Sequence, residues 1–137
     1  MNKTLRSVLA TVFCGLLWGY FAMAASTTFG SFAPIEASTD GLYAAALVGS
    51  LFMGLLLNDV RTILLSVAVA SVIMALVFTG ALVLSTFYIP SAPLDIVLLF
   101  AFQQSLPRML MTSVLGITGA FIVAILNTNL NLLPEWD

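Results

Sequence analysis

The most informative stretch of the chain is TILLSVAVASVIMALVFTGALVLSTFY, at residues 62–88. It contains no charged residue, and a helix that crosses a bilayer needs roughly 20 consecutive apolar residues. The stretch is therefore long enough to cross with some tilt. Pro90 and Pro93 follow it, and proline disfavours helix continuation because it lacks the amide donor. The sequence predicts a transmembrane helix here.

The composition of the whole chain points the same way. The 137 residues are 61% hydrophobic and only 7% charged, whereas about a quarter of the residues in a soluble domain are charged. Such a chain cannot cover a water-facing surface, so we predict an integral membrane protein with the lipid bilayer as a partner. The four basic residues form no cluster and the net charge is −2, which argues against nucleic acid as a partner.

Three further apolar stretches complete the predicted fold. It is an all-α single membrane domain of two helical hairpins, whose four transmembrane helices cover about 7–29, 41–57, 62–88 and 109–126. The first stretch has an alternative interpretation as a secretory signal peptide, since basic residues precede it and Ala22-Met23-Ala24 resembles a cleavage site. A short extra helix at 94–106, interfacial or re-entrant, precedes the last span. We place a break after it because Pro107 would interrupt a helix of roughly 50 Å.

The positive charges in short loops predict the orientation. Lys3 and Arg6 place the N-terminus in the cytoplasm, and Arg61, two spans later, agrees. Four spans return the C-terminus to the cytoplasm. Arg108 disagrees with this topology, because it then lies near the outer face. If 94–106 were re-entrant, Arg108 would lie inside and the acidic tail outside.

Two parts of the chain resemble each other. Residues 26–29 and 33–34, STTF and AP, recur 59 positions later as STFY and AP. The motif LVG at 47–49 also resembles VLG at 114–116. This pattern suggests two duplicated hairpins in parallel orientation. The alternative is that such residues recur at the end of any span.

Small residues spaced by four lie on one face of a helix and let two backbones approach closely. We expect either packing within the chain or docking of another subunit at these positions. They are Gly15, Gly19, Gly49, Gly54, Thr112, Gly116 and Ala120. Trp18 falls near the middle of its span, where we expect packing or contact with lipid.

The densest polar cluster inside an apolar stretch is Gln103, Gln104, Ser105 and Arg108. Unpaired amides in hydrocarbon cost several kcal/mol, so these side chains must meet protein, water or headgroups. We predict a partner-docking or polar site here. Asp95 belongs to the same region and is interpreted as a first-turn acid of the short helix, or as a partner of Arg108.

The sequence offers little for catalysis. It has no histidine, one cysteine and scattered acids, so we predict neither an enzyme nor a metal site. The cofactor is unknown, because an apolar cofactor held by packing is neither indicated nor excluded. The leading hypothesis is a small non-catalytic subunit that packs against other integral membrane subunits and stabilises a larger complex. The alternative is a homo-oligomeric channel or small transporter with a polar site at 103–108, extended by Thr79 and Thr112.

Overall fold

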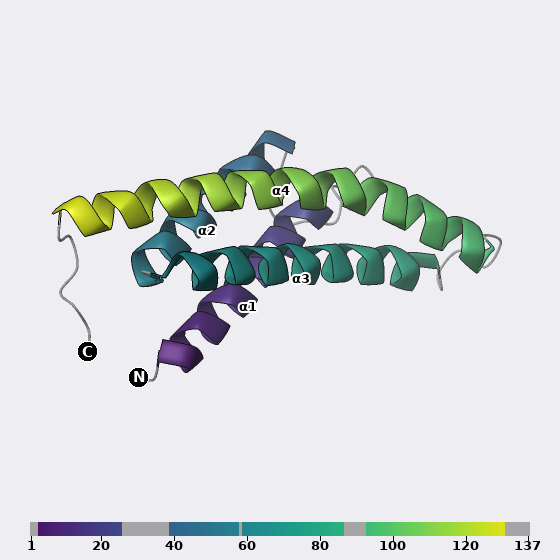
Figure 1. The fold of residues 1–137 in the computed structure, drawn as a ribbon. Helices are drawn as coiled ribbons and strands as arrows, with labels where there is room; N and C mark the ends of the chain where they lie inside the picture. The colour runs from purple at the N-terminus through teal and green to yellow at the C-terminus, as the bar shows by residue number, and fades with distance from the viewer. Residues whose placement is uncertain (1–2, 26–38, 58, 87–92, 131–137) are drawn as a thin grey trace.

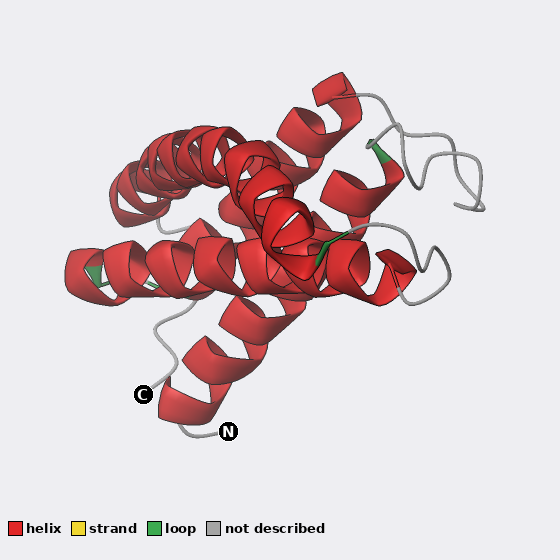
Figure 2. Ribbon diagram, turned by 90° about the vertical axis from the view of Figure 1, so that its right-hand side faces the viewer, coloured by secondary structure: helices red, strands yellow, loops and turns green. Residues whose placement is uncertain are grey.

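A computed structural model describes residues 3–25, 39–57, 59–86 and 93–130, and every regular element in these ranges is an α-helix (Figures 1 and 2). The prediction of an all-α fold is confirmed for this part of the chain. The four helices are α1 (Lys3–Ala24), α2 (Thr39–Leu56), α3 (Val60–Thr86) and α4 (Leu94–Leu130).

Three of these helices are long and apolar enough to cross a membrane. The qualifying segments are Thr4–Ala24, Val60–Leu84 and Leu94–Asn129, in α1, α3 and α4. The apolar segment of α2, Asp40–Leu56, is shorter. Length and composition therefore support a membrane protein with three clear candidate spans and a fourth, shorter apolar helix.

Local chemistry explains where α3 begins. Asp59 precedes the helix, and its carboxylate accepts hydrogen bonds from the backbone N–H of Thr62 (3.1 Å) and from the Thr62 hydroxyl (2.7 Å). The backbone N–H of Ile63 donates to the Asp59 carbonyl (2.9 Å). This is the arrangement of a helix N-cap, which satisfies amide donors that have no partner within the helix.

The four helices pack in a ring. α1 packs on α3, α3 on α4, α4 on α2, and α2 on α1. α3 and α4 run antiparallel side by side, and α1 crosses α3 at an angle (Figure 1). The contacts of α1 with α3 are more extensive than those with α2. The pairing of α1 with α2 in one hairpin and of α3 with α4 in another stays a prediction, because the more extensive contacts of α1 are with α3 and α2 packs on α4.

The predicted break at Pro107 is wrong. α4 is one continuous helix of 37 residues with Pro107 inside it, so the short helix at 94–106 and the last span at 109–126 form a single element. At 1.5 Å per residue it is about 55 Å long. Pro107 is exposed, so its ring displaces no neighbouring helix. Proline also removes only one amide donor from the helical ladder, and Ser105 before it and Thr112 after it are both buried in the bundle.

The stretches that suggest a repeat fall largely outside the described residues, since 26–34 and 87–92 are not among them. One contact inside the described part has the same separation. The hydroxyls of Ser7 on α1 and Ser66 on α3 lie 3.2 Å apart, 59 positions apart in sequence. This contact shows where α1 and α3 meet, and the repeat itself stays a prediction.

Candidate functional site

The predicted packing glycines of α1 lie directly against α3. A Cβ atom added to Gly15 would come within 2.8 Å of Ile73 Cβ, and one added to Gly19 within 2.8 Å of Val77 Cγ1. Both separations are too short for real Cβ atoms. The absence of a side chain at these two positions sets how closely the two helices approach.

The glycines of α2 and α4 are used in the same way. A Cβ atom at Gly54 would lie 2.5 Å from the backbone oxygen of Ala120, and one at Gly116 2.8 Å from Val67 Cγ1. Gly119, which sequence reasoning missed, would meet the side chain of Ser50. Gly119 lies three positions after Gly116, and this spacing on one helix face could have identified it as a packing residue. The structure therefore places these small residues at contacts between the helices of this chain.

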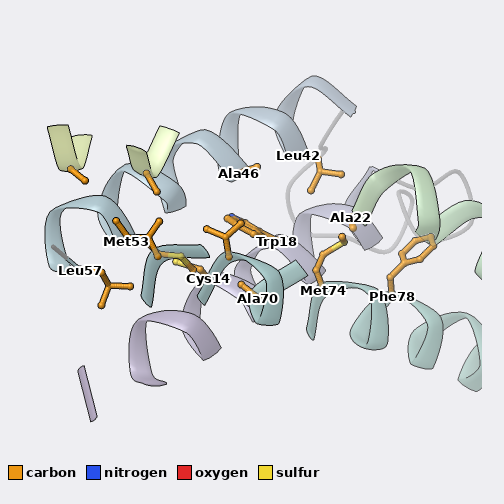
Figure 3. Packing of buried hydrophobic residues seen from close by; sticks show 14 of the residues in the cluster. Cys14, Trp18, Ala22, Leu42, Ala46, Met53, Leu57, Ala70, Met74 and Phe78 are labelled. Carbon is orange, nitrogen blue, oxygen red and sulfur yellow. The ribbon is translucent and has the colours of Figure 1, made fainter. Parts of the chain in front are cut away.

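Trp18 lies at the centre of the ring (Figure 3). Its side chain is fully buried, and its indole Nε1–H donates to the Ala45 carbonyl on α2 (3.1 Å). A Cβ atom added at Gly49 would lie 2.8 Å from the indole Nε1, and one added at Gly116 would lie 3.0 Å from the far edge of the indole. One indole thus fills the space between α2 and α4 while its polar group is satisfied, as burial of tryptophan requires.

The predicted packing residues Thr112 and Ala120 are fully buried on the inner face of α4. The Thr112 hydroxyl donates to the Arg108 carbonyl (2.8 Å). In the described part of the chain, every buried side-chain nitrogen or oxygen has a hydrogen-bond partner. The inner faces of the helices are thus closed by packing and by hydroxyls bonded to their own backbone.

The predicted polar cluster divides into separate environments. Arg108 Nη1 donates to both the backbone oxygen (2.7 Å) and the side-chain oxygen Oε1 (3.1 Å) of Gln104. The Arg108 guanidinium also lies 4.9 Å from the centre of the Phe78 ring on α3. Ser105 is buried instead, and its hydroxyl donates to the Phe102 carbonyl (3.2 Å). Only Gln104 and Arg108 act together.

Gln103 is exposed and does not join this pair. Gln103 belongs to a row of exposed residues, three or four positions apart, along one face of α4. We call this row the outer stripe; it consists of Ile96, Leu99, Gln103, Leu106, Leu110 and Val114. Positions three and four apart share a helix face. Within the described ranges, no group forms a hydrogen bond with the Gln103 side chain. The outer stripe is therefore an apolar surface with one polar group at its centre.

Asp95 does not join Arg108. It is exposed in the first turn of α4, and its separation of 13 positions from Arg108 corresponds to about 20 Å along the helix. A first-turn acid interacts favourably with the helix dipole. Over the residues that the structure covers, Arg108 has no carboxylate partner.

Other sites are sparse in the described part. A shallow groove between α1 and α3 is lined by Ser7, Thr11, Ser66 and aliphatic neighbours. No group of three or more His, Cys, Asp or Glu side chains in the described ranges could hold a metal ion. No family model, curated protein or solved structure matches the chain. Two features of α4 therefore stand out as candidate sites, the outer stripe and the pair of Arg108 with Gln104.

Proposed function

We propose that the chain is a non-catalytic integral membrane subunit that packs against another membrane protein through the outer stripe of α4. The observation that carries this proposal is the Gln103 amide, exposed among Leu99, Leu106 and Leu110 without a hydrogen-bond partner in the described part of the chain. A side-chain amide facing hydrocarbon is costly. A partner helix with a donor or acceptor would satisfy it.

The surface of the helix bundle supports the membrane environment. Large apolar side chains are exposed on all four helices, among them Phe13, Phe52, Leu76 and Phe102. A water-soluble monomer rarely exposes such a continuous apolar area. α2 has 18 residues, about 27 Å at 1.5 Å per residue, close to a hydrocarbon core of about 30 Å. We therefore propose four spans with both termini in the cytoplasm.

The outer stripe suits recognition of a partner better than the glycine faces do. Helices in lipid associate through close packing and hydrogen bonds, since lipid tails are as apolar as leucine. The glycines of α1, α2 and α4 already meet helices of the same chain. The outer stripe, by contrast, is an exposed row of branched side chains with one amide.

The test is purification of the tagged full chain from native membranes in mild detergent, followed by quantitative mass spectrometry. We expect a second integral membrane protein in fixed stoichiometry and its loss, several-fold, in Gln103→Leu. The matched control is Leu76→Ala, an exposed residue on α3, which should leave the companion unchanged. A chain that purifies alone, or a companion indifferent to Gln103→Leu, would refute the proposal.

A homo-oligomeric channel has less support. Gln103 is exposed, Ser105 is buried and Arg108 is tied to Gln104, so no single surface presents all the polar groups predicted to line a pore. An amide both donates and accepts, so two copies could still pair through Gln103. Cross-linking of a cysteine substituted at 99 or 106 would reveal such a pair as a dimer of this chain.

A further inference from the structure

Arg108 is the other polar feature of α4, and three helices contribute to its surroundings. Phe78 on α3 is 1% exposed and presents its ring to the guanidinium at 4.9 Å. Tyr43, four residues into α2, is half-buried and lies in the neighbourhood of the same group. Gln104 holds Nη1 from one turn earlier in α4. The guanidinium is thus held in one orientation by packing and hydrogen bonds.

This arrangement leaves one edge of the guanidinium unused. Both hydrogen bonds come from Nη1, and an arginine side chain carries five N–H donors. Among the described residues, nothing accepts from Nε or Nη2. Nε–H and one Nη2–H point the same way, which is the fork that binds two oxygens of one phosphate or carboxylate.

The charge at this position also lacks compensation. The two acceptors are a carbonyl and an amide oxygen, both neutral, and no carboxylate in the described ranges pairs with Arg108. The Phe78 ring stabilises the cation only in part, by about 1 kcal/mol for a partly exposed pair. A half-buried cation between apolar helices is therefore a site that an anion would complete.

The position of the Arg108 guanidinium along α3 and α4 determines which anions can reach it. Phe78 lies eight residues before the end of α3, about 12 Å at 1.5 Å per residue. The hydrogen bonds to Gln104 turn the guanidinium toward the start of α4, which lies beside the end of α3 (Figure 1). An arginine side chain can lie along apolar surface with its stem buried and extend its charged group toward the headgroup level.

We propose that Arg108, with Tyr43 beside it and Phe78 beneath it, binds a phosphate group through Nε and Nη2. Two sources share this chemistry: the phosphodiester of a phospholipid in the leaflet at the α3–α4 end, and a soluble phosphate. The Tyr43 hydroxyl adds a neutral donor. Gln103, on the other side of α4, takes no part, so this site is independent of the partner surface.

The experiment is native mass spectrometry of the full chain in a phosphate-free detergent, titrated with phosphatidylglycerol. Diacylglycerol, which has the same tails and no phosphate, is the ligand control. We expect wild type to retain phosphatidylglycerol and not diacylglycerol. Arg108→Gln should lower the bound fraction about tenfold or more, because hydrogen bonds to charged groups are the strong ones. Tyr43→Phe should lower it less, by about threefold.

Two controls separate the site from general effects. Arg61→Gln removes an exposed cation at the start of α3 and should leave lipid retention unchanged, as should Gln103→Leu. Excess inorganic phosphate distinguishes the sources. Displacement of the lipid, or phosphate binding by itself that Arg108→Gln abolishes, supports the site and assigns a soluble ligand. Retention of the lipid supports the site and assigns the phospholipid.

Equal retention by wild type and Arg108→Gln would overturn the proposal, as would equal retention of diacylglycerol. A stoichiometric protein partner released by Arg108→Gln, with lipid retention unchanged, would also overturn it, because a partner carboxylate would then be the anion. If circular dichroism shows that Arg108→Gln is misfolded, the Tyr43→Phe variant tests the site instead, because it keeps the aromatic ring and removes only the hydroxyl. Wild-type retention in Tyr43→Phe would then count against the site.

Discussion

The two halves of α4 have similar apolar content and opposite surroundings. From 111 to 127 the helix turns small residues inward, and Thr112, Ala120 and Ala124 are buried against the rest of the ring. From 94 to 110 only Ala101 and Ser105 are buried, while Leu94, Leu99 and Phe102 are more than half exposed. Small residues allow backbone contact within the chain. The first half of α4 has fewer such contacts, at Ala101 and Ser105, so its surroundings must supply what covers its exposed face.

The largest expected effect lies in the packed region. Trp18→Ala removes the fully buried indole that packs against Gly49 on α2 and Gly116 on α4, together with its hydrogen bond to the Ala45 carbonyl. Large-to-small changes of this kind cost about 3–5 kcal/mol in the free energy of unfolding. A denaturant titration in detergent, followed by circular dichroism, measures it. A cost below 1 kcal/mol would mean that the indole does not hold the ring together.

A smaller effect tests the close approach of α2 and α4. Gly54→Ala places a methyl group 2.5 Å from the backbone oxygen of Ala120, and backbone cannot move aside as a side chain can. We expect a loss of about 1–3 kcal/mol in the free energy of unfolding. Gly80→Ala is the matched control, because nothing lies within 4 Å of a Cβ atom there. That variant should gain slightly, since alanine favours a helix over glycine; similar losses in both variants would contradict the packing account.

The outer stripe should respond much less. Leu99→Ala and Gln103→Leu change exposed residues, so the isolated chain in detergent should keep its free energy of unfolding within about 0.5 kcal/mol. Gln103→Leu should nevertheless release the partner protein proposed above. A large loss of stability in the isolated chain would show that the first half of α4 packs on its own chain, which would remove the contrast between the halves.

Much of this fold could be predicted from the sequence, because long apolar stretches, and small residues spaced four positions apart, are local properties. The sequence does not predict which way the polar side chains point. Amphipathic patterning identifies the inner face of a soluble helix, but a membrane helix is apolar on every face. Gln103 and Gln104 are adjacent in the sequence, yet a turn of about 100° per residue sends one to the outer stripe and the other to Arg108.

The continuity of α4 through Pro107 was also beyond the sequence. Proline removes an amide donor, and that local loss alone predicts a break. Whether the helix continues depends on the packing of the turns on either side. Here Ser105 and Thr112 are buried against other helices, and both hydroxyls bond to the backbone of α4. The hydroxyl bonds form within α4, but the burial of the two side chains arises only when the helices assemble.

The smallest predicted effect concerns the start of α3, where a local cap can be separated from packing. The hydrogen bonds from Thr62, above all the one from its hydroxyl, lower the pKa of the exposed Asp59 carboxyl below its ordinary value of 3.8. A carboxyl with a depressed folded-state pKa stabilises the fold above its unfolded value, and this contribution is lost as the pH falls through the folded value.

The amides at 60–64 should therefore lose protection from hydrogen exchange as the pH is lowered below about 3.8, the ordinary value for this carboxyl. Thr62→Val keeps the shape and removes the hydroxyl, so it should reduce this pH dependence, and Asp59→Asn should abolish it. The amides of α4 around Gly116 serve as the internal reference, because their protection comes from packing. If both regions lose protection together, the cap and the packed ring unfold as one unit, and the start of α3 is no more independent than its centre.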